Sequence, residues 1–273
     1  MKTTSIAGRL FGLTCLGLGG LALTGCGGGG GHSTPDIVTG AGGRLQDVQI
    51  GPRPGSAFVS PSTTFQLSWA AAAPPPATFG VLLRRYQEPR GGESKDTGAQ
   101  NITVTQQGPG FVYNVGRKDG YPLDIGGVYY LDLHSGAGES RQAAFITDGG
   151  PTVPDNQSTQ TVSPGTGGSL SGLTLVPAPG SVNIPKNTAF LLSWNGPTPP
   201  PSQFTVSLHR YKEARGTDTG SNEEQNITIS AQGGSVWRVR RKDAYDLESD
   251  GTYYLEVSAP GQDPVRAAYI ISS

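Results

Sequence analysis

The stretch Phe204-Thr205-Val206-Ser207-Leu208-His209 alternates apolar and polar side chains. Successive side chains of an extended strand point to opposite faces, so this alternation predicts a strand with one buried and one exposed face. The same parity recurs 125 residues earlier, where Phe79, Val81 and Leu83 occupy the apolar positions. The two stretches therefore predict the same kind of half-buried strand at two places in the chain.

The region around these strands is duplicated. Pro54-Gly55-Ser56 recurs as Pro179-Gly180-Ser181, and Leu67-Ser68-Trp69 recurs as Leu192-Ser193-Trp194. Further matches are Arg85-Tyr86 with Arg210-Tyr211, Gln100-Asn101-Ile102-Thr103 with Gln225-Asn226-Ile227-Thr228, Arg117-Lys118-Asp119 with Arg241-Lys242-Asp243, and Gly127-Val128-Tyr129-Tyr130-Leu131 with Gly251-Thr252-Tyr253-Tyr254-Leu255. The offset falls from 125 to 124 along the way, so one deletion separates two collinear copies. A period this long indicates tandem domains and not a solenoid.

Each copy carries about seven short strand patterns separated by Gly- and Pro-rich turns, and no stretch keeps a helical period. This spacing of strands in about 100 residues is typical of a sandwich. We therefore expect an all-β chain with two tandem seven-stranded antiparallel β-sandwiches.

Each copy has four spaced features in common with a known kind of domain. A Trp closes the second strand, a Pro-rich loop follows, the third strand starts with an aromatic residue, and a Leu precedes a Tyr by six residues. The Leu and Tyr are Leu123 and Tyr129 in the first copy, and Leu247 and Tyr253 in the second. Together these features resemble a fibronectin type III domain, and an immunoglobulin-like sandwich fits nearly as well. The resemblance implies a tyrosine corner, in which the phenol hydroxyl bonds to backbone upstream.

The N-terminus has the pattern of an export signal. Lys2 and Arg9 precede an apolar run from Leu10 to Leu23, which is shorter than the ~20 residues of a membrane-spanning helix. The run ends in Leu23-Thr24-Gly25-Cys26, which resembles the lipobox of bacterial lipoproteins. The resemblance implies that Cys26 is lipidated and becomes the mature N-terminus, with the membrane as a partner. Gly27 stands where an Asp would resemble an inner-membrane retention signal, which favours the cell envelope's outer membrane.

Together these patterns divide the chain into five segments. They are a lipoprotein signal peptide at 1–25, a Gly-rich tether at 26–43, a first sandwich at 44–148, a linker at 149–169 and a second sandwich at 170–273. The tether and linker are rich in Gly, Pro, Ser and Thr and poor in apolar residues.

The composition offers little for catalysis or for nucleic acid. Twenty basic and 21 acidic residues leave a net charge of −1, so no global field would collect nucleic acid. Both cysteines lie within the first 26 residues, and no phosphate-cradling or HExxH motif occurs. The sandwiches contain His134 and His209, which we expect to be solvated strand residues. The sequence thus predicts no enzyme, no cofactor, no metal site and no catalytic residue.

The one specific hypothesis about a binding site concerns four tyrosines. If the third and penultimate strands are neighbours, Tyr86 and Tyr130, with Tyr211 and Tyr254 in the second copy, share the outer face of their sheet. Such aromatics can stack on sugar rings, form a partner-binding patch or simply make cross-strand pairs. We therefore expect a surface-tethered, non-enzymatic interaction or scaffold lipoprotein. The alternative is a carbohydrate- or peptidoglycan-binding lipoprotein that uses these four tyrosines, with a cell-envelope glycan or protein as the partner.

Overall fold

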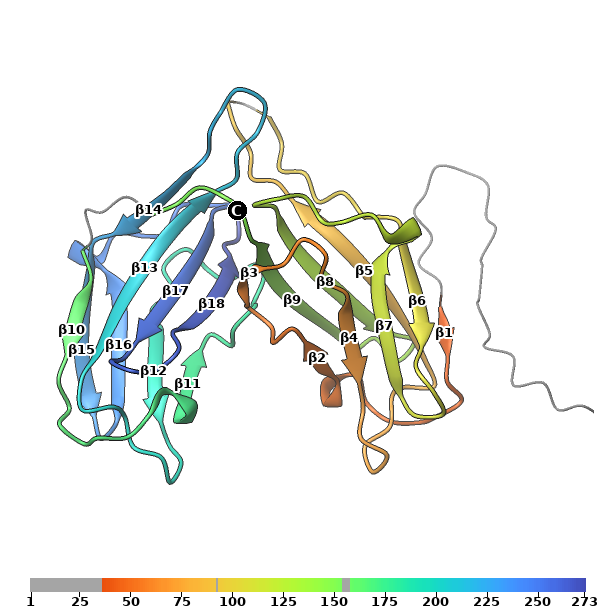
Figure 1. Ribbon diagram of the computed structural model, residues 1–273, viewed down its shortest axis with the longest axis horizontal. Coiled ribbons are helices and arrows are strands. Elements are labelled where there is room, and N and C mark those ends of the chain that lie inside the picture. Colours follow the sequence, from red (N-terminus) through yellow and green to blue (C-terminus); the bar gives the residue numbers. More distant parts are fainter. Residues whose placement is uncertain (1–35, 92, 154–157) are drawn as a thin grey trace, which may run out of the picture.

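A computed structural model describes residues 36–91, 93–153 and 158–273 (Figure 1). Cys26, the signal peptide and most of the tether lie outside the described residues, so their expected roles stay predictions.

The first copy folds as two packed sheets. One has the strand order β2-β4-β7-β6 and the other β1-β5-β8-β9-β3. The strands are β1 (Ile37–Val38), β2 (Gln49–Gly51), β3 (Ala57–Val59), β4 (Phe65–Ser68), β5 (Thr78–Tyr86), β6 (Ile102–Gln106), β7 (Val112–Arg117), β8 (Val128–Ser135) and β9 (Ser140–Thr147). All of these pairs are antiparallel except β3 with β9, which is parallel.

The second copy repeats this plan, with orders β11-β12-β16-β15 and β10-β13-β17-β18, and β14 also pairs with β13. Its strands are β10 (Gln160–Val162), β11 (Leu173–Val176), β12 (Phe190–Trp194), β13 (Phe204–Lys212), β14 (Ser221–Gln225), β15 (Ile227–Gly233), β16 (Val236–Arg241), β17 (Thr252–Ser258) and β18 (Val265–Ile270). Seven strands are common to the two copies. Lettered A to G, they are β2, β4, β5, β6, β7, β8 and β9 in the first copy and β11, β12, β13, β15, β16, β17 and β18 in the second. Both sets pair A-B-E-D in one sheet and C-F-G in the other, the arrangement of an immunoglobulin constant-type sandwich. The expected all-β fold of two tandem sandwiches is confirmed. Beyond the seven strands expected in each copy, the first copy adds β1 and β3 and the second adds β10 and β14, and the β3–β9 pair is parallel where only antiparallel pairs were expected.

Helical structure in the described residues is limited to short 3-10 turns. These are η1 (Leu45–Asp47), η2 (Lys118–Gly120), η3 (Leu170–Gly172) and η4 (Lys242–Ala244). The turns η2 and η4 occupy the duplicated Arg-Lys-Asp positions just before the tyrosine corners.

The core of each sandwich follows the alternation in the sequence. Phe79, Val81 and Leu83 on β5 are fully buried, and so are Phe204, Val206 and Leu208 on β13. Trp69 and Trp194 close the two cores in the same way, because the indole N–H of each donates to a backbone carbonyl 25 residues upstream at 3.1 and 2.9 Å. The parity of these strands is therefore confirmed in both copies.

Both expected tyrosine corners are present. The backbone N–H of Asp124 donates to the phenol oxygen of Tyr129 at 2.9 Å, and that of Glu248 donates to Tyr253 at 3.0 Å. In the first copy the Tyr129 hydroxyl also donates to the Asp124 carboxylate at 2.9 Å. The phenol thus binds backbone upstream, as the Leu-to-Tyr spacing predicts, and it does so as an acceptor.

Part of the expected linker belongs to the second sandwich. Strand β10 pairs with the start of β13, and the Gly168 and Ser169 amides donate to the carbonyls of Pro200 and Pro199 at 2.8 and 3.0 Å. Linker composition reflects the lack of apolar side chains, but backbone groups alone suffice for an edge strand.

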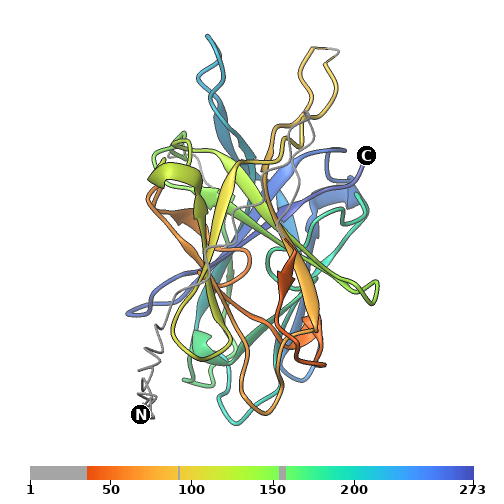
Figure 2. The same ribbon diagram turned by 90° about the vertical axis from the view of Figure 1, so that its right-hand side faces the viewer.

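The two sandwiches join along one edge and diverge below it, as an inverted V (Figure 1). At the join, β18 contacts both β9 and β3. Two hairpins project beyond it from the same end of the molecule (Figure 2). We call them the first arm, described residues 87–91 and 93–98, and the second arm, residues 212–221.

Candidate functional site

The four tyrosines of the sequence hypothesis meet between the sandwiches. Strands β5 and β8 are neighbours, as are β13 and β17, so the expected pairing of third and penultimate strands is confirmed. The expectation that the four side chains are exposed is wrong, because Tyr86, Tyr130, Tyr211 and Tyr254 are between 0 and 7% exposed. They form one apolar cluster with residues of both sheets: Val128, Ala144, Ile146, Ala268 and Ile270. These tyrosines lie on the sheet face that points away from the core of their own sandwich, and in each copy the other copy covers this face.

Two of the tyrosines link the domains by matched hydrogen bonds. The Tyr86 hydroxyl donates to the Asp250 carbonyl at 2.6 Å, and the Tyr211 hydroxyl donates to the Gly126 carbonyl at 2.8 Å. Burial raises the pKa of both phenols, so they stay protonated donors at neutral pH. Each bond crosses the interface in the opposite direction, as a two-fold relation between the copies requires.

The backbones also meet at the join. The Ala144 amide donates to the Gly180 carbonyl at 2.8 Å, and the Ala268 amide donates to the Gly55 carbonyl at 2.7 Å. Gly55 and Gly180 have φ of +81° and +82° and lie so close that a Cβ on Gly180 would be 2.7 Å from the Gly55 nitrogen. The duplicated Pro-Gly-Ser motif therefore permits a backbone contact that another residue would prevent.

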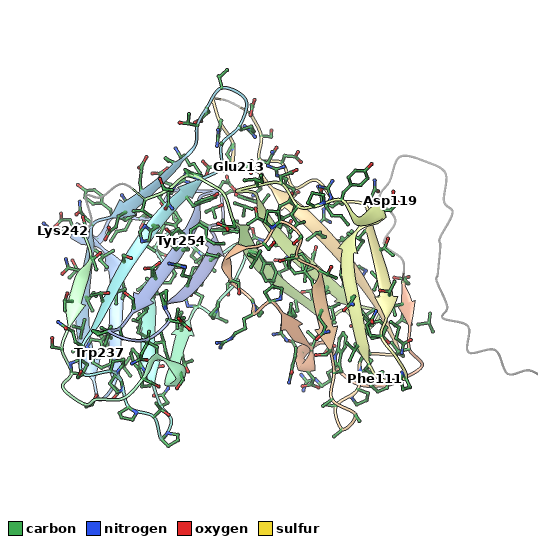
Figure 3. All side chains as sticks on the ribbon, viewed as in Figure 1. Phe111, Asp119, Glu213, Trp237, Lys242 and Tyr254 are labelled. Atoms are coloured by element: carbon green, nitrogen blue, oxygen red, sulfur yellow. The ribbon has the colours of Figure 1, made fainter. Side chains whose placement is uncertain are left out.

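Ion pairs connect the bases of the arms. Arg210 binds Glu88 at 2.6 Å and Arg85 binds Glu213 at 2.7 Å, which are matched pairs in the duplicated numbering. Further out, Arg90 binds Asp218 at 2.6 Å and Arg215 binds Glu93. Figure 3 places Glu213 at the crest where the arms meet. These contacts, the tyrosine bonds and the glycine contact make the two sandwiches one body with an internal pseudo-two-fold axis.

His209 is buried beside this interface and is not the solvated residue expected from the sequence. It is 3% exposed, its ring stacks on Tyr254 at 4.4 Å, and its Nε2 lies 2.8 Å from the Ser207 hydroxyl. Burial lowers its pKa from 6.5 to about 4. In the first copy Arg84 holds this position and pairs with Asp132 at 3.4 Å. His134 is partly buried at a strand end.

The His209 environment predicts acid sensitivity. The unfolded chain takes up a proton near pH 6.5, whereas the folded imidazole stays neutral down to about pH 4. The contribution of His209 to the free energy of unfolding should therefore be highest above pH 6.5 and fall by about 3 kcal/mol as the pH drops to 4. Urea unfolding of wild type and His209→Gln across this range measures the effect. The variant should show a shallower loss, since all other groups titrate in both proteins, and parallel curves would contradict the prediction.

The duplicated Arg-Lys-Asp turns present a different kind of surface. Arg117 donates to the Pro122 carbonyl at 2.8 Å and Arg241 to the Asp246 carbonyl at 2.6 Å, so each Arg closes its own turn. The next aromatic residues, Tyr121 and Tyr245, are 67% and 70% exposed. Among the exposed large apolar side chains of the described residues, these two are the pair at matched positions of the copies. Asp119 and Lys242 mark the turns on opposite outer sides of the molecule in Figure 3.

We call these two elements the outer turns, residues 117–122 and 241–246. Sequence reasoning found the Arg-Lys-Asp triplets but not the tyrosines, although both tyrosines follow their triplet at the same distance. The sequence does not show that Tyr121 and Tyr245 are exposed, because a tyrosine at this position could equally well have a packed side chain.

The described residues contain no group of three or more His, Cys, Asp or Glu side chains placed to hold a metal ion. In the same part of the chain, no helix has the length and apolar character needed to span a membrane.

The fold and the interface define a two-domain all-β protein built from a duplicated immunoglobulin-type sandwich. No protein-family model and no curated protein matches the chain. Solved structures that are similar include the N-terminal Ig1-2 module of the Drosophila receptor protein tyrosine phosphatase DLAR, at 14% identity over 82% of this chain and 97% of that one, with a TM-score of 0.21. The Ig1 and Ig2 domains of DIP-gamma are 11% identical over 83% of this chain and 97% of theirs, with a TM-score of 0.20.

An endo-fucoidan hydrolase of glycoside hydrolase family 107 is 10% identical and covers 86% of this chain but 30% of its own length, with a TM-score of 0.20. At these identities and TM-scores the likenesses carry no argument about function. The argument about function therefore depends on the geometry above.

Proposed function

We propose that this chain is a non-enzymatic lipoprotein of the cell envelope that holds two outer turns at a fixed separation for binding to a partner. The lipobox-like sequence at Cys26 supports anchoring to a membrane, most simply the outer one, and the Gly-rich segment after it supports a tether. The partner is a protein or glycan of the envelope.

The observation that carries the proposal is the pairing of a locked interface with matched exposed tyrosines. Tyr121 and Tyr245 lie at equivalent turns. The other duplicated aromatic side chains are buried in the two cores or in the interface. Two weak sites held on one rigid body bind a repetitive or dimeric partner far more tightly than either alone. Exposed Tyr side chains next to Lys and Asp also suit recognition, because they combine apolar area with polar contacts.

The alternative use of Tyr86, Tyr130, Tyr211 and Tyr254 to bind carbohydrate is not supported by this arrangement. Their rings are covered by the opposite sandwich, and stacking on sugar needs a free ring face. A glycan partner would instead meet the outer turns.

Retention on envelope material tests the binding proposal. The variant Tyr121→Ala/Tyr245→Ala should lose at least tenfold in retention on purified outer-membrane vesicles or cell-wall sacculi, and each single variant should lose less, because avidity needs both turns. Val38→Ala/Val176→Ala is the matched control, since it removes apolar groups that are 72% and 51% exposed at unrelated positions. Equal retention by the double variant and the control would refute the role of the turns.

The anchor has its own test. Labelled palmitate fed to cells should mark the wild-type protein and leave Cys26→Ser unlabelled, with the variant released from membranes. Labelling of the variant, or none of the wild type, would contradict the anchor without affecting the binding result.

A further inference from the structure

A groove of about 590 Å³ lies between the two sandwiches. The first sandwich contributes Arg53, Ser56 and Arg141 to its lining, and the second contributes Leu173, Pro179 and Arg266. Its volume falls in the range of small-molecule sites, about 300–1,000 Å³. The groove exists because the locked interface fixes the angle between the sandwiches, so neither copy forms it alone.

The charge of this groove differs from that of the whole protein. Three arginines line it and none of its lining residues is acidic, although the chain as a whole carries a net charge of −1. The Nε of Arg266 binds the carboxylate of Glu256 at 2.6 Å, and Glu256 itself does not line the groove. Arg141 donates from Nη1 to the backbone carbonyls of Gln46 and Val48 at 2.9 and 2.6 Å, which fixes the guanidinium without neutralising it.

The duplication shows that the fold does not require these cations. Arg53 corresponds to Ala178 in the other copy, Arg141 to Val265, and Arg266 to Gln142. The strands next to these positions, β2 and β9 in the first copy and β11 and β18 in the second, form with and without the charge. Three positively charged side chains have therefore accumulated on one shared groove where the repeat tolerates neutral residues.

We infer that the groove binds a small oxyanion-bearing ligand, the carboxylate or phosphate of an acidic sugar, through the guanidinium groups of Arg53, Arg141 and Arg266. A guanidinium presents a planar fork of N–H donors that matches carboxylate and phosphate oxygens. The hydroxyls of Ser56, Ser171 and Thr174 add partners for sugar hydroxyls, and the Pro, Leu and Val side chains of the lining supply apolar walls. The site is separate from the outer turns and does not depend on the function proposed for them.

Calorimetric titration of the intact protein with glucuronate, glucose 6-phosphate, inorganic phosphate and neutral glucose tests the inference. Both acidic sugars should bind, glucose should not, and added salt should weaken binding because the attraction is ionic. Binding of glucuronate but not of either phosphate would assign a carboxylate site, and the reverse would assign a phosphate site. Equal binding of glucose, or affinities of all anions weaker than about 10 mM, would overturn the inference.

The variant Arg53→Ala/Arg266→Gln places the residues of the opposite copy at two of the three positions. It should weaken anion binding at least tenfold. The matched control Arg238→Gln/Arg240→Gln removes the same charge from β16, which contributes no residue to the lining of the groove, and should leave binding unchanged. Arg53→Ala alone removes an exposed side chain and so tests the site even if loss of the Arg266 pair with Glu256 lowers the melting temperature. Equal anion binding by Arg53→Ala, the double variant and the control would refute the site.

Discussion

The variant Gly180→Ala should lose the fixed arrangement of the two sandwiches and about 4 kcal/mol of stability. The residue has φ of +82°, a left-handed conformation that costs an L-residue roughly 1–2 kcal/mol. Its new Cβ would be 2.7 Å from the Gly55 nitrogen and 3.1 Å from the Pro54 backbone, so the opposing backbones must separate. Separation breaks the two reciprocal amide bonds of Ala144 and Ala268, each contributing about 1 kcal/mol.

The measurement combines denaturant unfolding with hydrogen exchange at the Ala144 and Ala268 amides, which should lose protection in the variant. Gly261→Ala is the matched control, because its φ is +71° but a Cβ there meets nothing within 4 Å. The control carries the conformational cost without the contact, so it should lose about 1–2 kcal/mol and keep its amide protection. If both variants behave alike, the glycine contact does not hold the sandwiches together.

The variant Glu88→Gln should destabilise the protein by about 3 kcal/mol, close to the cost of breaking a buried ion pair. The side chains of Glu88 and Arg210 are 8% and 5% exposed, and they meet at 2.6 Å across the interface. Neutralising Glu88 leaves the Arg210 cation in a poorly solvated place. Glu248, at 3.1 Å and 55% exposed, neutralises it only in part.

Thermal and urea unfolding of Glu88→Gln beside Glu93→Gln measures this cost. Glu93 is the arm partner of Arg215 and is 65% exposed, so its loss should cost less than about 1 kcal/mol. The double variant Glu88→Gln/Arg210→Met should recover part of the loss, because it removes the stranded charge. A small effect of Glu88→Gln, similar to that of Glu93→Gln, would show that the pair is not buried in solution.

Both predictions concern the same property, a fixed geometry between the sandwiches. That geometry sets the distance between the outer turns and forms the arginine-lined groove, so variants that unlock it should impair both sites at once. Variants of the turns or of the groove should instead impair one site and leave the other unaffected.

Local patterns in the sequence were enough to determine each sandwich. Alternation fixed which residues of β5 and β13 face the core, because a side-chain period of two leaves a single choice of face. The resemblance to a fibronectin type III domain implied both tyrosine corners, and these are also local features, since the hydrogen bond spans five residues of one chain segment. Duplication of the strand patterns predicted two copies of the fold, and the seven strands that the copies have in common pair in the same order in both.

The burial of His209 could not be predicted from such local sequence patterns. The parity of its strand places it on the outer face, where an uncovered sheet would leave it solvated. In the structure the other sandwich covers that face. Its Phe58, for example, has its ring centroid 5.3 Å from that of Tyr254.

The sequence by itself therefore determined the fold of each copy, its core and its outward-facing tyrosines. The tertiary structure decided what those tyrosines contact, which arginines line one groove and which aromatic residues stay exposed. The physical reason is that alternation assigns a side chain to a face, whereas the covering of that face depends on contacts between residues more than 100 positions apart, such as Tyr86 with Asp250.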